Sequence, residues 1–364
     1  MRRNRTAFVT FFPILPDNMG SSAVINSRFK NWPGKKMLFQ ISHVKKINNN
    51  NIQTVFIKKE TPINKILKLP EVIRKVFNYL KDAKNKTIII EGASWIFYSF
   101  VTLVLLKILL PNSKVIYISH SIESEIRKKY SNMFIFFLTK ILEKLVFTYS
   151  DLSTSVSNKE RAKIIKLYKK ETILYPNAIS LNVKLVKKVM KGDYIIYTGS
   201  YTYRPNKYAI DYLSSKIMPI LLENNPKLKL VITGGGYNKK IPWLINKGIV
   251  SKKKLYNLIY FSKCMCIPLK FGSGTRIKII EALSLGAIVI SSKKGIEGIE
   301  LINKAPPFIT NNTREFIKTI NKIIRDYKDI KKKSIKSKTY YLKKYSMKNI
   351  TRNFIQRNLN AYLK

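Results

Sequence analysis

A short loop of small residues, Gly272 to Thr275, is the part of the chain whose residue types point most directly to chemistry. It follows an apolar run, Cys264 to Leu269, and precedes a helical pattern that starts at Arg276 and ends at Gly286. Such a loop can bring backbone N–H groups and the positive end of a helix dipole close to a phosphate. The pattern therefore predicts an anion site, although an ordinary turn between a strand and a helix would look the same.

Two cations and one carboxylate occupy the first turns of this predicted helix. Arg276 and Lys278 stand in the first turn, where positive charge is unfavourable unless an anion is bound nearby. Lys278 and Glu281 are three residues apart and therefore share a face of the helix. A bound anion would offset this cost, and a group anchored by its phosphates at the helix start could offer ribose hydroxyls to Glu281. Backbone N–H groups near Gly274 and Thr275 would complete the site.

The overall charge of the chain is extreme for a folded protein. Its 364 residues include 69 Lys and Arg against 20 Asp and Glu, which gives a formal net charge of +49. Such a potential attracts nucleic acid, anionic lipid or phosphorylated substrates, although coding bias would account for part of it. The sequence shows neither a recognised nucleic-acid-binding module nor basic–aromatic interleaving, so we expect no nucleic-acid partner.

Cysteine usage and hydropathy indicate a reduced, cytoplasmic protein. Cys264 and Cys266 alternate in an apolar run, which predicts buried strand residues and favours neither a disulfide framework nor a zinc site. No signal peptide is evident, because the apolar segment after the basic start is broken at Pro13 and Pro16. The most apolar stretch, 95–110, is short for a bilayer and predicts a buried helix.

Short apolar runs alternate with helical patterns along the whole chain. The predicted strands are 5–12, 36–42, 54–58, 87–91, 114–119, 152–156, 172–175, 194–197, 229–233, 264–269 and 287–291. This alternation predicts an α/β protein with mainly parallel, doubly wound sheets. A polar, basic stretch at 181–193 separates two similar halves, which we assign to residues 1–185 and 186–345.

Ligands of doubly wound sheets bind at the carboxyl ends of the strands. Four predicted site residues follow strands in this way: Gly20 after the first strand, His120, Gly199 and Gly234. We expect His120 to contact a substrate and the glycines to form turns beside phosphate or nucleotide. A structural histidine and plain turn glycines are the alternative interpretation of the same positions.

The order and spacing of the motifs resemble retaining glycosyltransferases of the GT-B fold, the family 4 type also called "glycosyl transferases group 1". The matching segments are 197–200, 204–206, 232–236, 268–282 and 295–298, together with Gly20, His120, Glu123, 155–157 and 176–177 in the first half. The resemblance implies two Rossmann-like domains that face each other across a cleft. It also implies that the final helix, 346–364, packs back on the first domain.

The chain departs from the family pattern at three places. The family has two glutamates eight positions apart, of which Glu281 matches the second, whereas Ser273 stands where the first would hold the donor sugar. The paired glycines of the first loop are reduced to Gly20. The arginine and lysine that often follow the first strand of the second domain are not clearly present, so Arg276 and Lys278 would replace them as the diphosphate clamp.

The resemblance implies transfer of a sugar, with retention, from a nucleotide-diphosphate sugar without a metal or another cofactor. The acceptor would be a lipid-linked or growing glycan of a capsule, an O-antigen or an exopolysaccharide. The stretch 133–147 combines aromatic and aliphatic residues with Lys140 and Lys144 on another face, so it predicts either peripheral binding to the inner face of the cell membrane or simple packing on the sheet.

Two other functions remain open from the sequence. A sugar-nucleotide epimerase would have a similar fold, but it would be expected to show more catalytic acids and more histidines than the two present here. A basic protein without enzymatic activity that binds nucleic acid or an anionic membrane would also explain the charge.

Overall fold

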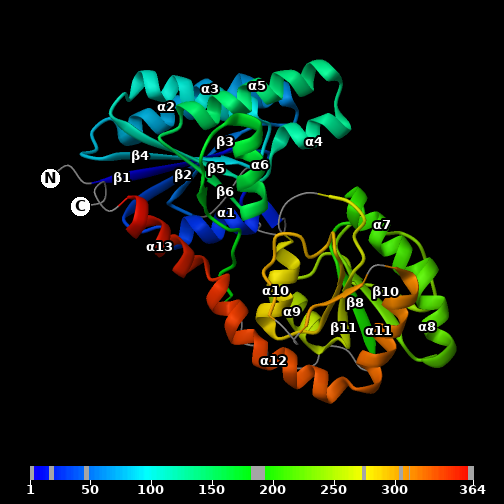
Figure 1. Ribbon diagram of the computed structural model, residues 1–364. Helices are drawn as coiled ribbons and strands as arrows, with labels where there is room; N and C mark the ends of the chain where they lie inside the picture. Colours follow the sequence, from blue (N-terminus) through cyan, green and yellow to red (C-terminus); the bar gives the residue numbers. More distant parts are fainter. Residues whose placement is uncertain are drawn as a thin grey trace. The chain divides into compact units, whose positions relative to one another are not determined.

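The computed structural model describes residues 4–15, 20–44, 49–181, 193–272, 276–302, 306–310 and 312–359. The chain forms two compact units, which are drawn in Figure 1. The first unit comprises Met1–Ala178 and Met347–Lys364, and the second comprises Ile179–Ser346. The division thus lies at Ala178, whereas the boundary expected from the sequence, 185/186, lies outside the described residues.

The first unit is built on a seven-stranded parallel sheet. Its strands are β1 (Arg5–Thr10), β2 (Lys35–Ser42), β3 (Ile52–Phe56), β4 (Lys86–Gly92), β5 (Ser113–Ser119), β6 (Leu152–Ser155) and β7 (Ile173–Leu174). They lie in the order β3-β2-β1-β4-β5-β6-β7, and the register pairs Ala7 with both Met37 and Ile88. The direction of winding reverses between β1 and β4, so the carboxyl ends of these strands form the switch point where doubly wound sheets bind ligands.

Helices cover both faces of this sheet. They are α1 (Gly20–Asn31), α2 (Pro62–Leu80), α3 (Ile96–Leu109), α4 (Glu123–Tyr130), α5 (Met133–Tyr149), α6 (Asn158–Tyr168) and α13 (Met347–Asn358). Helices α2, α3 and α5 lie side by side and share one core with the sheet (Figure 1). On the other face, α13 packs against α1, where Phe354 joins Phe29 and Trp32 in a second core. The last helix of the chain is therefore part of the first unit.

The second unit repeats this plan with six parallel strands in the order β10-β9-β8-β11-β12-β13. The strands are β8 (Tyr194–Thr198), β9 (Lys229–Thr233), β10 (Leu244–Asn246), β11 (Cys264–Ile267), β12 (Val289–Ser292) and β13 (Phe308–Thr310). The helices are α7 (Arg204–Tyr212), α8 (Met218–Asn224), α9 (Lys252–Phe261), α10 (Ile277–Leu285), α11 (Thr313–Arg325) and α12 (Tyr327–Lys344). A π-helical turn, Leu213–Ile217, joins α7 to α8.

The fold predicted from the sequence, two doubly wound α/β domains, is confirmed by these two sheets, and the predicted C-cap at Gly286 is also present. Gly286 ends α10 in the left-handed conformation with φ of 75°. The start predicted for α2, Pro70, is wrong, because the helix begins at Pro62 and passes through that proline. Pro70 is exposed there, so its ring does not compete for space in the core. The three-residue strands β10 and β13 were not predicted.

Cys264 and Cys266 are buried free thiols in β11, as their alternation in an apolar run predicted. Across the described part of the chain, no helix combines the length and the hydrophobicity that a bilayer crossing requires. The same residues contain no group of three or more His, Cys, Asp or Glu side chains arranged to hold a metal ion.

Candidate active site

Lys278 lies at the centre of the candidate site in the second unit. Helix α10 begins directly after Arg276, so Lys278 stands in its first turn. Its ammonium group turns toward the carboxyl end of β8, where it donates hydrogen bonds to the carbonyl oxygen of Thr198 and, over 3.0 Å, to Oδ1 of Asn206. The same nitrogen lies 4.4 Å from the centre of the Tyr197 ring. The side chain thus joins the start of α10 to the end of β8.

The position of Lys278 makes its positive charge costly. Burial of the ammonium group lowers its pKa to about 7, and the nearby charge of Arg276 acts in the same direction, while Glu281 opposes it. The three oxygen partners of Lys278 are neutral, so none of them compensates the charge fully. A bound anion would compensate the charge of Lys278.

Two glycines predicted as turn residues leave room for this arrangement. Gly199 directly follows β8 with φ of +136°, and a Cβ there would lie 2.6 Å from Nδ2 of Asn206 and 2.8 Å from Nζ of Lys278. Gly234 follows β9 with φ of +112°, and its Cβ would lie 2.5 Å from the backbone carbon of Gly199. A Cβ at Gly199 would therefore meet the side chains of the site, and a Cβ at Gly234 would meet the backbone that follows β8, so neither position has space for a side chain.

Arg276 and Glu281 flank Lys278 on the same helix. The guanidinium of Arg276 reaches back to the loop before the helix, since a Cβ on Gly272 would lie 2.4 Å from its Nη2. Glu281 lies near the middle of α10, where its Oε1 accepts a hydrogen bond of 2.7 Å from the hydroxyl of Tyr256 on α9. The structure thus brings Arg276, Lys278, Glu281 and Gly199 to one part of the second unit.

The loop residues Ser273, Gly274 and Thr275, of which Gly274 and Thr275 were predicted to contribute backbone N–H groups, lie outside the described residues. Sequence reasoning also assigned no role to Tyr197 or Asn206. Asn206 connects the site, because its Oδ1 accepts from the Tyr197 hydroxyl over 2.7 Å and its Nδ2 donates to the carbonyl of Ser200 over 2.9 Å. The segment 204–206 had been recognised only as part of a motif.

His120 belongs to a different set of charged residues in the first unit. It follows β5 directly, and its Nε2 lies 2.7 Å from Oε2 of Glu91 at the end of β4. Arg28 on α1 donates from Nη1 to both carboxylate oxygens of Glu91, over 2.7 and 2.6 Å. All three side chains are buried. Glu91 and Arg28 were not among the predicted site residues, because 63 positions separate them and no local motif joins them.

The charges of this set balance. Burial alone would raise the pKa of Glu91, but the charge of Arg28 and the hydrogen bond from His120 outweigh burial, so the pKa lies below its usual value. Glu91 is therefore ionised beside a charged Arg28. Gly20, the remaining predicted residue, is the first residue of α1, and among the described residues no atom outside its chain neighbours and its own helix backbone lies within 4 Å of the position of its missing Cβ.

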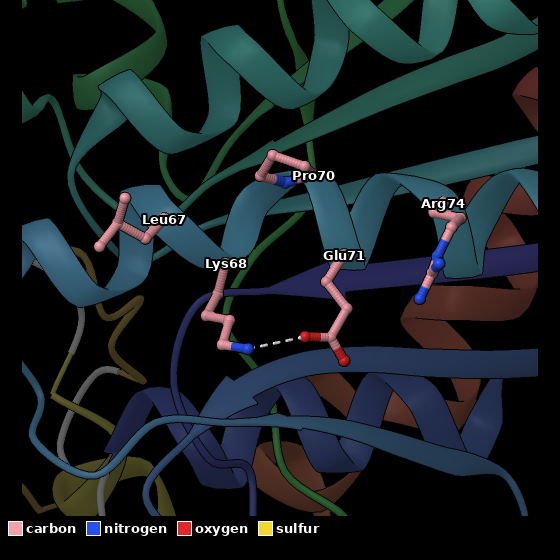
Figure 2. Close-up of a pocket in the computed structure, with 5 residues that line it drawn as sticks. All are labelled: Leu67, Lys68, Pro70, Glu71 and Arg74. Atoms are coloured by element: carbon pink, nitrogen blue, oxygen red, sulfur yellow. Dashed lines mark hydrogen bonds and ion pairs between the residues drawn. The ribbon is translucent and has the colours of Figure 1, made fainter.

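A hollow on the first unit is lined by none of these residues. Figure 2 shows that it is lined by Leu67, Lys68, Pro70, Glu71 and Arg74, which all belong to α2. Lys68 and Glu71 are joined there by an ion pair of 3.0 Å. Because the hollow lies along one helix and contains no strand end, we do not assign it a role in catalysis.

The segment with the Lys278 site matches a known family. Residues 192–326, which include β8 and α10, match the family described as "Glycosyl transferases group 1". The whole chain superposes on a sucrose-phosphate synthase from Thermosynechococcus elongatus with a TM-score of 0.73 and 13% identity, over 99% of this chain and 100% of that one. The chain is a glycosyltransferase of the GT-B fold. Its two parallel sheets with flanking helices are the two Rossmann-like domains of that fold.

Two further solved structures resemble this glycosyltransferase over almost the whole chain. The Anabaena protein HepE, in complex with UDP and glucose, gives a TM-score of 0.71 at 11% identity and covers 98% of this chain and 99% of its own. WaaG, a glycosyltransferase involved in lipopolysaccharide biosynthesis, gives 0.68 at 11% identity, with 98% of this chain and 100% of that one covered. A comparison with curated protein sequences gave no match.

Proposed function

We propose that the enzyme transfers a sugar, with retention, from a nucleotide-diphosphate sugar whose diphosphate binds at the start of α10. The observation that carries this proposal is the position of two cations at one helix N-terminus, close enough for Arg276 to lower the pKa of Lys278. Glu281, further along the helix, would accept hydrogen bonds from the ribose hydroxyls. The structure of HepE with UDP-glucose supports a donor of this chemical class.

The same geometry would favour the transition state over the bound substrate. Negative charge grows on the diphosphate as the glycosidic bond breaks, so cations and helix N–H groups aimed at it become more favourable during the reaction. Arg276 would bind the phosphate oxygens in a planar, bidentate manner, and Lys278 would add a compact charge. In a retaining mechanism the departing phosphate itself takes the proton of the acceptor hydroxyl, so the proposal assigns no step to a pair of carboxylates.

A panel of UDP-, GDP- and ADP-sugars tests the donor site through thermal stabilisation, because a ligand that binds only the folded state raises the melting temperature. We expect one class of nucleotide sugar to stabilise the wild type. The control variant Arg325→Ala, which changes an exposed arginine at the end of α11 that is paired with Asp326, should be stabilised equally. Arg276→Ala should lose this stabilisation. Retained stabilisation in Arg276→Ala would show that the phosphate clamp is assigned to the wrong residue.

A lipid-linked acceptor is supported by an apolar surface on the first unit. Helix α5 buries Leu142 and Val146 in the core under the sheet, whereas Phe134, Phe137 and Ile141 are 72%, 52% and 58% exposed. On the neighbouring α3, Ile108 is 69% exposed. Patches of exposed aromatic and aliphatic residues on a surface helix are typical of membrane-interface binding.

Two lysines belong to the same helix as this apolar surface. Lys140 and Lys144 are exposed on α5, and the chain as a whole carries a formal charge of +49. Apolar contact and attraction to anionic headgroups would then act together. We therefore propose that the enzyme binds the inner face of the cell membrane through α3 and α5 and acts there on lipid-linked glycan acceptors of a surface polysaccharide.

Co-sedimentation with vesicles tests the membrane proposal. We expect salt-dependent binding to vesicles with phosphatidylglycerol and weak binding to phosphatidylcholine alone. Phe134→Ser with Phe137→Ser should abolish it, whereas Ile63→Ser with Leu67→Ser, a similarly exposed pair on α2, should retain it. Equal binding by both double variants would contradict the assignment. Tighter binding to duplex DNA than to the anionic vesicles would instead favour the nucleic-acid alternative.

A further inference from the structure

Three side chains joined by short polar contacts lie at the switch point of the first sheet. Glu91 at the end of β4 lies between Arg28 on α1 and His120 after β5, and the nitrogen–oxygen distances from Glu91 to both are 2.6 to 2.7 Å. The first two side chains are fully buried, and His120 is 8% exposed. Of the three side chains, His120 is therefore the one that reaches the surface, at the place where doubly wound sheets bind ligands.

Arg28 is held from its other side as well. Its guanidinium carbon lies 4.7 Å from the centre of the Tyr175 ring. The hydroxyl of Tyr175 lies 2.9 Å from Oγ1 of Thr351 on α13, and its ring stacks on Phe354 with the centres 4.5 Å apart. Helix α13 thus helps to hold the side chain of Arg28 in place.

The chemistry of Glu91 fixes which nitrogen of His120 carries a proton. An ionised carboxylate can only accept hydrogen bonds, so the Nε2 atom that faces Glu91 must be protonated. In a neutral imidazole only one nitrogen is protonated, so in that form Nδ1 of His120 presents a lone pair. Without Arg28, a buried Glu91 would favour the neutral acid, which can donate a hydrogen bond and would permit the opposite tautomer.

We propose that Glu91 and Arg28 are positioning residues that hold His120 with Nε2 protonated and direct Nδ1, as a hydrogen-bond acceptor, to a hydroxyl of the carbohydrate substrate. This inference rests on the proposed function, since that function supplies the sugar hydroxyl. A purely structural ion pair between α1 and β4 would explain the Arg28–Glu91 contact. It would not require the second contact from Glu91 to a histidine at the surface of the switch point.

The tautomer of His120 can be measured directly, because the chain contains only two histidines. In long-range ¹H–¹⁵N spectra of protein labelled at histidine nitrogens, we expect His120 in the wild type to show a protonated Nε2 and a lone-pair Nδ1. Glu91→Gln places an amide in the same space. When its oxygen accepts from Arg28, its N–H group donates to His120, which should reverse the tautomer.

His43 provides the internal control for these spectra. It lies on the same unit, half-exposed, with its Nδ1 3.0 Å from Glu60, and should not change in Glu91→Gln. A wild-type His120 protonated at Nδ1 would overturn the inference, and so would a Glu91→Gln spectrum in which His120 is unchanged. These readouts come from the protein without substrate, so they test the inference even if the proposed glycosyl transfer fails.

Kinetics separates positioning from a merely structural role. We expect Glu91→Gln to lower kcat by about tenfold, the size expected when one hydrogen bond to the substrate is lost. Nucleotide-sugar stabilisation of the second unit should persist in this variant. Because Glu91 is proposed to act through His120, the double variant Glu91→Gln with His120→Ala should be no slower than His120→Ala alone.

Two outcomes of the kinetics would overturn the inference: additive effects in the double variant, or an unchanged kcat in Glu91→Gln. If Glu91→Gln does not fold, Arg28→Met with Glu91→Gln removes both buried charges together and avoids a buried unpaired cation. That variant leaves no carboxylate to hold Nε2 protonated, so the His120 spectrum should differ from that of the wild type, and an unchanged spectrum would also refute the proposal.

Discussion

The lowered pKa of Lys278 makes binding of the donor dependent on pH. Its ammonium group has a pKa of about 7 because it is buried and lies near Arg276. A diphosphate beside it would favour the charged form and return the pKa toward its usual value of about 10.4. Because the pKa of the complex would exceed that of the free enzyme, binding takes up a proton at pH values between the two. Affinity should then be constant below pH 7 and fall above it.

The size of the effect follows from the fraction of Lys278 that has lost its proton in the free enzyme. With a pKa of about 7, the dissociation constant should rise about tenfold from pH 6 to pH 8 and about 30-fold to pH 8.5. Near pH 8, binding should take up about 0.9 proton for each nucleotide sugar. A nucleotide-diphosphate sugar is the right probe because its phosphates have no further ionisation near neutral pH.

Isothermal titration calorimetry in two buffers with different ionisation enthalpies measures this proton uptake. Lys278→Arg keeps a positive charge at every pH tested, so its uptake should vanish. Lys331→Arg is the matched control, because burial also lowers the pKa of Lys331, to about 8, but its ammonium binds the carbonyl of Tyr260. Uptake should persist in this control. Wild-type affinity that is constant from pH 6 to 8.5, or uptake of the same proton by Lys278→Arg, would refute a charged contact between Lys278 and the donor.

Three substitutions test other contacts. Gly199→Ala should lower the free energy of unfolding by about 1–3 kcal/mol in urea titrations, because φ is +136° and the added Cβ would meet Asn206; an unchanged midpoint would contradict this. Tyr256→Phe removes the donor to Glu281 and should cost about 0.5–1.5 kcal/mol of nucleotide-sugar affinity in calorimetry, whereas equal affinity would argue against a role for this contact. Burial raises the pKa of Glu160 to about 7, so its ionised form costs stability above pH 7 and this cost disappears toward pH 5. Glu160→Gln should therefore raise the melting temperature more at pH 8 than at pH 5, and equal shifts would count against it.

Most of the fold could be predicted from the sequence because short apolar runs between polar turns have one favourable place in a parallel sheet. The strands expected at 87–91 and 114–119 were placed within one residue of β4 and β5. The short strands β10 and β13 have three residues each, too few for a pattern to emerge from the surrounding polar chain. The start of α2 was misplaced because Pro70, which ends most helices, stands inside this one.

The candidate site was predictable only where its residues are close in the sequence. Arg276, Lys278 and Glu281 lie within six positions of one another, so helical spacing alone placed them together. The direction of the Lys278 side chain depends on Tyr197 and Asn206, which come from β8 and α7 and cannot be paired with it by spacing. For the same reason, nothing in the sequence indicated that Glu91, the polar end of an apolar strand, would bind both Arg28 and His120.

The two units balance charge at their strand ends in opposite ways. In the first, the charges of Arg28 and Glu91 cancel, so an ionised carboxylate faces Nε2 of His120 before any ligand arrives. In the second, burial and the nearby charge of Arg276 disfavour the charge on Lys278, so we expect a bound anion to complete the arrangement. Changes at Glu91 should therefore be visible in the free enzyme, as a changed tautomer. Changes at Lys278 should be visible mainly in the complex with the donor, as altered affinity and proton uptake.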